Sequence, residues 1–268
     1  KSLFQETALR LSSSDSCFFA PPMIVTNFEY RFIVKNQLEA VGIVPETIMI
    51  EPEVKNTAPA ILAAALQQFK KCEGSIMLVS PSDHFVPDTK HIQKTFMTCL
   101  PYVKDGKIAT FGIKPTHPET GYGYIKSSNL SDTEVSKVIE FVEKPRFEKA
   151  VKMLKDGNYL WNSGIFMFQV RDLIDAFKKL DNDNLKKVQA AVDGSYTDLN
   201  FLCLEKSAWG KVKNNSIDFA VMEKVKNLVV KPYLHAWSDL GNWDSVSKAM
   251  SNDGQEVSLS DKAIAVDC

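Results

Sequence analysis

Two carboxylates that lie far apart in the chain, Asp83 and Asp239, are candidates for holding one divalent cation. Asp83 follows a short apolar run and Pro81, and Asp239 lies in W-S-D-L-G-N-W. Mg²⁺ is usually bound by one or two protein carboxylates together with phosphate oxygens. The pair therefore predicts a magnesium site and a nucleoside triphosphate substrate. The alternative is that an aspartate in such a loop is only a turn former or a helix cap.

A second set of residues suits a sugar phosphate. Gly121 and Gly123 in E-T-G-Y-G-Y-I allow a ligand to approach the backbone without a Cβ. Glu143 can accept hydrogen bonds from sugar hydroxyls, Lys144 can meet a phosphate as a point charge, and Asn162 offers an amide. Each feature also has a structural reading, as turn glycines, a solvated ion pair and an amide that satisfies neighbouring backbone. Only their combination with the cation pair favours a sugar phosphate site.

The composition excludes several classes of protein. The 268 residues carry a formal net charge of −1 and are 44% hydrophobic, which is typical of a folded globular protein and argues against a general nucleic-acid or membrane binder. Five cysteines without a C-x-x-C pair favour reduced thiols. We find no apolar run of about 20 residues and no signal peptide. The expected partners are small molecules, in the cytoplasm.

Strands and helices alternate as far as Pro115. Predicted strands cover 22–27, 47–52, 75–79 and 107–113, and predicted helices cover 3–11, 28–41, 57–71 and 89–102. This alternation predicts an α/β protein with a mixed, mostly parallel central sheet and helices on both faces. Ligands bind beyond the carboxyl ends of the strands in such sheets. Asp83, directly after the buried 75–79 strand, is therefore expected at a binding edge.

The pattern changes after Pro115. Predicted strands at 122–126 and 134–145 should add antiparallel strands to the sheet, and 159–168 is expected as a further buried strand. We expect Thr57 to cap the helix that follows it and Ser216 to cap a short helix with Asp218 in its first turn. We expect one nucleotide-binding domain over residues 1–250, and residues 251–268 as the start of a linker or β element.

Seven motifs in order carry a resemblance to a known family. They are N-T-A-P-A, P-S-D-H, G-Y-G-Y-I, F-V-E-K-P, W-N-S-G-I-F-M-F, S-I-D-F-A-V-M-E-K and W-S-D-L-G-N-W. To about Ser251 the chain resembles the bacterial mannose-1-phosphate guanylyltransferases (GDP-mannose pyrophosphorylases) of the sugar nucleotidyltransferase family. The resemblance implies a Rossmann-like nucleotide-diphospho-sugar transferase fold. It also implies a Mg²⁺-assisted, in-line attack of mannose 1-phosphate on the α-phosphate of GTP, which yields GDP-mannose and pyrophosphate.

The same resemblance implies a role for each candidate residue. The metal ligands would be Asp83 and Asp239, which with Lys144 would form the catalytic set. The nucleotide would be bound by Glu51, Asn56, Thr57 and Asp83. The sugar phosphate would be held by Gly121, Gly123, Glu143, Lys144, Asn162 and Gly164.

The chain departs from this family at its start and in its length. The family opens with a strand and a glycine-rich, arginine-containing loop that wraps the triphosphate, whereas this chain starts after that point and without a methionine, so we expect that segment to precede Lys1. The longer relatives carry a cupin-type isomerase domain, for which 268 residues leave no room.

Thymidylyl or uridylyl specificity and a non-catalytic regulatory relative remain alternative functions. A glycosyltransferase is disfavoured because its usual D-x-D motif is replaced here by Ser82-Asp83-His84. A homodimer is possible.

Overall fold

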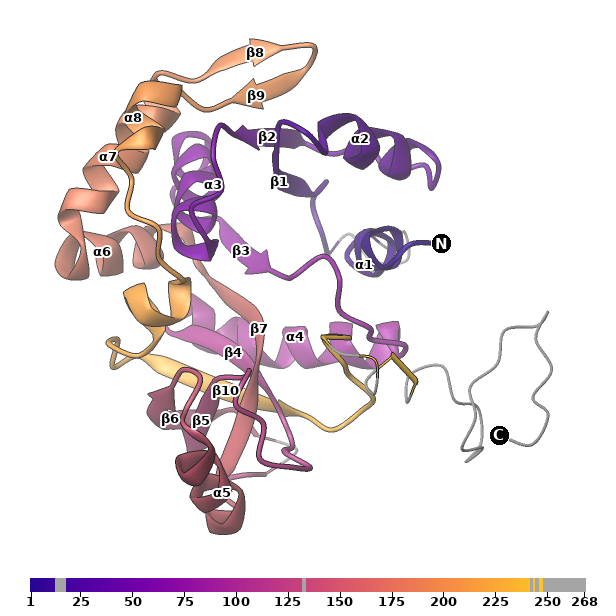
Figure 1. Cartoon of the computed structure of the whole chain (residues 1–268), viewed down its shortest axis with the longest axis vertical. Coiled ribbons are helices and arrows are strands. Elements are labelled where there is room, and N and C mark those ends of the chain that lie inside the picture. The colour runs from indigo at the N-terminus through magenta and orange to yellow at the C-terminus, as the bar shows by residue number, and fades with distance from the viewer. Residues whose placement is uncertain (13–17, 132–133, 242, 244–245, 248–268) are drawn as a thin grey trace.

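The computed structural model describes residues 1–12, 18–131, 134–241, 243 and 246–247. Over these residues the strands form a four-stranded sheet of order β1-β2-β9-β8 and a six-stranded sheet of order β3-β7-β4-β10-β6-β5, with helices around them (Figure 1). The predicted α/β class and mixed sheet are confirmed. The expected β element from 251 onward lies outside the described residues.

The elements have the following bounds. The strands are β1 (Met23–Asn27), β2 (Thr47–Glu51), β3 (Ile76–Val79), β4 (Ile108–Ile113), β5 (Tyr124–Ser127), β6 (Ser136–Val142), β7 (Tyr159–Gln169), β8 (Tyr196–Asp198), β9 (Phe201–Cys203) and β10 (Leu228–Tyr233). The helices are α1 (Leu3–Arg10), α2 (Arg31–Glu39), α3 (Thr57–Lys71), α4 (Thr89–Lys104), α5 (Phe147–Asp156), α6 (Val170–Leu180), α7 (Asn182–Asp193), α8 (Lys206–Gly210) and the π-helical turn η1 (Asp218–Met222). None of them, within the described ranges, has the length and apolarity needed to cross a membrane.

Strand directions differ from the expectation of one mostly parallel sheet. Parallel pairing joins β1 to β2, β2 to β9 and β4 to β10. β7 runs antiparallel to β3, β4 and β5, and β6 runs antiparallel to β5 and β10, so the predicted antiparallel additions are confirmed. The strands also form two sheets, because among the described residues no strand of the β1-β2-β9-β8 sheet pairs with a strand of the other sheet. A strand that is buried on both faces is apolar throughout, so its sequence pattern does not reveal its direction.

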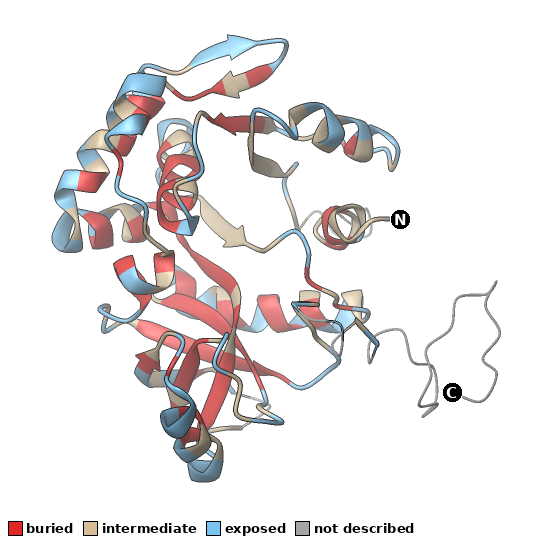
Figure 2. Ribbon diagram, in the orientation of Figure 1, coloured by how far each residue is buried: buried red, intermediate tan, exposed pale blue. Residues whose placement is uncertain are grey.

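Helices cover both faces of the six-stranded sheet, as predicted. Side chains of β7 alternate between two cores: Phe166 and Phe168 pack with α3 and α6, whereas Ile165 and Met167 pack with α4. Figure 2 shows the buried residues concentrated in β4, β7 and β10. A third, smaller core joins α1 and α2 to β2. These cores hold the strand ends, where the candidate residues lie, in fixed positions.

Four local predictions need correction. The cap of α3 is Asn56, whose Oδ1 accepts from Thr57 N at 2.8 Å, so Thr57 is the first helical residue. Helix α2 begins at Arg31 and not at residue 28, because Asn27 Oδ1 accepts from two following backbone N–H groups and forms a turn. Strand β3 is half-buried, not buried, because among the described strands it pairs only with β7. The residue that caps η1 is Ile217 and not Ser216, although Ser216 Oγ accepts from Phe219 N at 3.3 Å and Asp218 lies in the first turn as predicted.

Candidate functional site

A short antiparallel bridge brings the segments of Asp83 and Asp239 together. Phe85 N donates to Ser238 O at 2.8 Å, and Ser238 N donates to Phe85 O at 3.0 Å. Residues next to such a bridge face each other, so His84 comes beside Asp239. Burial lowers the pKa of His84, and the charges of Asp83 and Asp239 oppose that shift, so both carboxylates act on the same ring. The structure thus assembles the predicted pair from distant segments.

Asp83 and one oxygen of Asp239 are available to a cation. Asp239 Oδ1 accepts from Tyr122 OH at 2.5 Å and from Gly241 N at 3.1 Å, which orients the carboxylate. Asp83 is exposed, and within the described ranges neither carboxylate forms an ion pair with a lysine or arginine. Two carboxylates without a cationic partner are the donor set that hard divalent cations select. The residues present therefore fit Mg²⁺.

Glycine at position 123 lets a carboxylate lie against the backbone that leads into β5. A Cβ at Gly123 would lie 2.6 Å from Glu143 Oε2 and 3.2 Å from Asn162 Cβ. Asn162 N donates to Gly123 O at 2.8 Å and ties the same backbone to β7. The structure thus brings Gly123, Glu143 and Asn162 together, and a Cβ at position 123 would force the Glu143 carboxylate to move.

Glu143 and Lys144 differ sharply in exposure. The side chain of Glu143 is 8% exposed and that of Lys144 is 61% exposed, with Lys144 Nζ 3.6 Å from Glu143 Oε1. Burial, and next the charge of Asp218, raise the pKa of Glu143 to about 7, although Lys144 opposes the shift. The reading as a solvated pair therefore fails for Glu143 and holds for Lys144. A desolvated carboxylate beside an exposed ammonium suits a ligand with both hydroxyls and a phosphate.

Asn162 positions an acid that the sequence analysis assigned only to a helix end. Its Nδ2 donates to Asp218 Oδ1 at 2.9 Å, and its Oδ1 accepts from Gly164 N at 3.1 Å and from Thr110 Oγ1 at 3.3 Å. Burial raises the pKa of Asp218, whereas the hydrogen bond from Asn162 and the charge of Lys144 lower it. Asp218 is thus a second carboxylate of the candidate site, close enough to Glu143 for its charge to act on that residue. The signal that could have found it is its place in S-I-D-F-A-V-M-E-K, one of the seven motifs.

The two remaining glycines behave differently. Gly164 adopts φ +70°, and a Cβ there would lie 3.4 Å from Pro81 Cγ and 4.0 Å from His84 Cε1, so it joins β7 to the Asp83 loop. Gly121 N donates to Glu119 Oε1 at 2.8 Å, which is the turn role named as the alternative. Sequence reasoning missed Tyr122, which lies between Gly121 and Gly123 and connects this loop to Asp239. Its position between two candidate glycines was the available signal.

The nucleotide candidates divide between two places. Thr57 Oγ1 accepts from Ile217 N at 2.9 Å, which ties the start of α3 to the residue before Asp218. Asn56 caps α3 with φ 67°. Glu51 ends β2 in the other sheet, away from β5 and β6 in Figure 1. Burial raises the pKa of Glu51 to about 7, and its Oε1 is buried without a hydrogen-bond partner among the described residues. A buried acceptor without a partner is unusual, and it marks Glu51 as a residue that packing alone does not explain.

The antiparallel direction of β7 explains why these groups meet. Its amino-terminal half lies beside the carboxyl ends of β3 and β4, with Asn162 opposite Gly112 and Phe166 opposite Val79. Asn162 and Gly164 therefore lie at the same sheet edge as the loop of Asp83. A parallel β7 would have placed them at the opposite edge.

Known proteins are similar to this chain in sequence. Residues 1–256 match the family model "Nucleotidyl transferase". The chain is 40% identical to a mannose-1-phosphate guanylyltransferase of Sinorhizobium fredii over 92% of its own length and 48% of the relative. It is 39% identical to a mannose-1-phosphate guanylyltransferase of Escherichia coli over 91% of its length and 53% of the relative. The chain thus spans about half the length of these curated relatives.

The fold is shared with a solved structure. The crystal structure named mannose-6-phosphate isomerase from Helicobacter pylori matches with a TM-score of 0.80 and 27% identity, over 89% of this chain and 90% of that one. The match of the family model extends over nearly the whole chain, including the segments of every candidate residue. The chain belongs to the nucleotidyl transferase family.

Proposed function

We propose that the protein forms GDP-mannose and pyrophosphate from GTP and mannose 1-phosphate. The observation that carries the proposal is the bridge between Phe85 and Ser238, which brings together the segments of two carboxylates without a cationic partner among the described residues. Tyr122, next to Gly123, links Asp239 to the cluster of Glu143, Asn162 and Asp218. The names of the guanylyltransferase relatives support the choice of substrates. A cation site next to a desolvated acceptor for hydroxyls is what a reaction between a triphosphate and a sugar phosphate requires.

The residues bind and orient, and no protein nucleophile takes part. A phosphate oxygen of mannose 1-phosphate attacks the α-phosphorus of GTP, and the bond from that phosphorus to the bridging oxygen breaks, which releases pyrophosphate. Asp83 and Asp239 would hold Mg²⁺, which when bound supplies positive charge to the phosphate oxygens. Positioning of the two substrates then accounts for the rest of the rate.

Each end of the substrate pair has its own acceptors. The Glu143 carboxylate accepts hydrogen bonds from sugar hydroxyls, with Asp218 held beside it by Asn162. The exposed Lys144 reaches toward the sugar phosphate as a point charge. At the other end, the Glu51 carboxylate would accept from the N–H groups of guanine, and Asn56 and Thr57 would lie near the ribose.

A substrate panel tests the proposal. Pyrophosphate release should be measured for the full-length protein with GTP, ATP, UTP and dTTP, each with mannose 1-phosphate and with glucose 1-phosphate. GTP with mannose 1-phosphate should give the highest kcat/KM, and EDTA should abolish the reaction. A higher kcat/KM with UTP or dTTP would contradict the choice of nucleotide. Binding of GDP-mannose without turnover of any pair would favour a regulatory relative.

We further infer that residues 1–250 form the nucleotidyltransferase domain and that the protein acts in the cytoplasm. Cys72, Cys99 and Cys203 are all free thiols, which suits a reducing compartment. A homodimer remains a prediction that size-exclusion chromatography with light scattering checks.

A further inference from the structure

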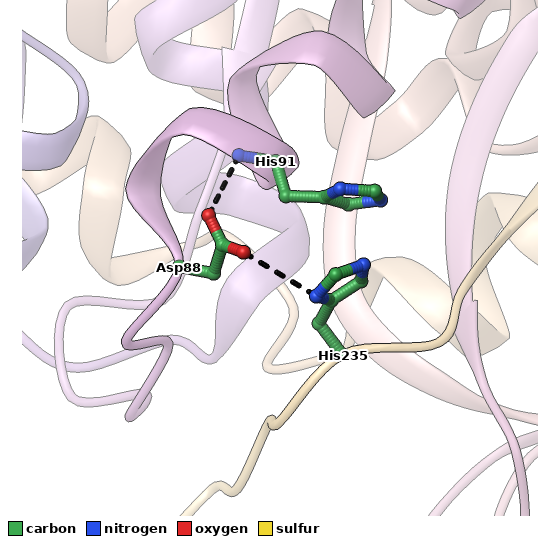
Figure 3. A group of neighbouring side chains, drawn as sticks. All are labelled: Asp88, His91 and His235. Atoms are coloured by element: carbon green, nitrogen blue, oxygen red, sulfur yellow. Dashed lines mark hydrogen bonds and ion pairs between the residues drawn. The ribbon is translucent and has the colours of Figure 1, made fainter.

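Three side chains with metal-binding chemistry lie together outside the nucleotide and sugar sites. They are Asp88, His91 and His235, shown in Figure 3, and their ligand atoms all lie within 4.8 Å of one another. Asp88 Oδ2 is 3.3 Å from His235 Nδ1, and the two imidazole rings stack with centroids 3.5 Å apart at 33°. None of the roles proposed above uses these side chains.

The first turn of α4 fixes the carboxylate in place. Asp88 Oδ1 accepts from His91 N at 2.9 Å and so caps the helix, while Oδ2 points toward His235 (Figure 3). One oxygen therefore positions the group and the other remains for a second partner. The cap also sets His91 in the same helical turn as Asp88, close to the incoming segment of His235.

The donor set and its spacing suit a tetrahedral transition-metal ion. Two imidazoles and one carboxylate bind Zn²⁺ with bonds of about 2.0–2.2 Å, which puts neighbouring donors roughly 3.3 Å apart. Asp88 Oδ2 and His235 Nδ1 already have this separation. His91 is exposed, so its ring can rotate to close the set. Mg²⁺ prefers oxygen ligands and does not match two imidazoles.

A buried tyrosine closes the inner side of the cluster. The ring of Tyr233 lies 6.0 Å from that of His91 and 5.6 Å from that of His235, and the residue is 1% exposed. Its hydroxyl is buried and has no hydrogen-bond partner among the described residues. A buried aromatic ring thus borders the two imidazoles.

We propose that Asp88, His91 and His235 form a site for a divalent transition-metal ion of the Zn²⁺ class, separate from the Mg²⁺ site. The ion would join the start of α4 to the segment after β10. These are the segments that the Phe85–Ser238 bridge already holds together. The metal would therefore fasten the two segments that carry Asp83 and Asp239. Any effect on turnover rests on the proposed function, but binding itself does not.

Cobalt spectroscopy and zinc competition test the site on protein without a histidine tag. Co²⁺ should give the intense visible bands of tetrahedral coordination at one equivalent, and Zn²⁺, but not excess Mg²⁺, should displace it. Zn²⁺ should also raise Tm, because it binds the folded state. His91→Ala and His235→Ala should each weaken Zn²⁺ binding at least tenfold. Asp88→Asn should weaken it as well, although the amide oxygen can still cap α4.

Three controls separate this site from other donors. Cys72→Ser removes an exposed thiol, His117→Ala removes an exposed imidazole that pairs with Glu119, and Asp83→Asn with Asp239→Asn removes the Mg²⁺ ligands. All three proteins should bind Zn²⁺ as the unmodified protein does. Loss of binding in any of them, or unchanged binding in a His91→Ala/His235→Ala double variant, would overturn the proposal. Absence of binding at micromolar Zn²⁺ would do the same, whether or not guanylyl transfer is found.

Discussion

Two pairs of carboxylates at the same sheet edge have opposite surroundings. Asp83 and Asp239 are exposed or half-buried and have no cationic side chain as partner in the described residues. Glu143 and Asp218 are desolvated, and burial is the first cause of the raised pKa of each. Desolvation penalises the charged form of a carboxyl group, so keeping such a carboxylate charged costs the folded protein stability. One pair suits a cation, and the other suits neutral hydroxyls.

Neighbouring residues maintain this difference. Asn162 donates to Asp218, and Lys144 is the exposed cation beside Glu143. At the other pair, the Tyr122 hydroxyl donates to Oδ1 of Asp239 and so orients the carboxylate, but it does not bind Oδ2. Because Tyr122 and Gly123 are consecutive, a single loop sets the distance between the two pairs.

The largest expected effect comes from the exposed pair. Asp83→Asn and Asp239→Asn should each lower kcat/KM about 100-fold or more, because each removes charge at the cation site and keeps the side-chain shape. Asn at 239 can still accept from Tyr122 OH, so the fold should survive, as circular dichroism would check. Asp105→Asn, in an exposed loop, is the matched control and should be silent. Near-normal turnover in either site variant would show that these carboxylates do not bind the metal.

A smaller effect is expected at Gly123, where a side chain would collide with Glu143. Gly123→Ala places a Cβ 2.6 Å from Glu143 Oε2, so the carboxylate must move, at a cost of about 1–3 kcal/mol for overpacking. We expect about a tenfold to 100-fold loss in kcat/KM for mannose 1-phosphate. Gly74→Ala is the control, because its Cβ would meet nothing within 4 Å. Equal behaviour of the two variants in kinetics and urea unfolding would rule out the close approach at Gly123.

A substitution at Glu143 should change the KM for mannose 1-phosphate more than the KM for GTP. Glu143→Ala removes a charged acceptor, for which a loss of about 1.5–3 kcal/mol, roughly tenfold or more in KM for mannose 1-phosphate, is expected. The KM for GTP should change less than about threefold. Initial-rate kinetics with each substrate varied in turn would check this. A parallel rise in both KM values would argue against a sugar-specific role.

The smallest expected effect is on how the free energy of unfolding changes with pH. The pKa of Glu143 is raised from 4.5 to about 7 in the folded protein, so the unfolded chain loses its proton first as pH rises. The associated stability is complete below about pH 4.5 and is lost as pH rises to about 7, by about 1–3 kcal/mol. Glu143→Gln should remove that loss. Urea unfolding at pH 5 and pH 8 would measure the loss in the unmodified protein and in the variant. If the free energy of unfolding changed equally with pH in both proteins, the burial of the Glu143 charge would be contradicted.

Local sequence patterns are sufficient to predict most of the elements. The alternation of short apolar runs and amphipathic segments locates β1 to β4 and the helices between them, because burial on one or two faces leaves a period that short-range patterns carry. The errors lie at boundaries: the turn made by Asn27 delays α2, and Asn56 takes the cap predicted for Thr57. The residue types at Asp83, Glu143 and Asn162 likewise indicate their chemistry, because carboxylates and amides offer the same acceptors and donors in any fold.

Only the tertiary structure decided which of these residues meet. The antiparallel direction of β7 sets Asn162 and Gly164 at the edge of Asp83, and an apolar strand carries no sign of its direction. The bridge of Phe85 to Ser238 joins the segments of the two candidate metal ligands, and the contact of Asn162 with Asp218 adds an acid that the sequence placed only at a helix end. Such contacts depend on long-range packing, whereas the sequence determines propensity and burial residue by residue.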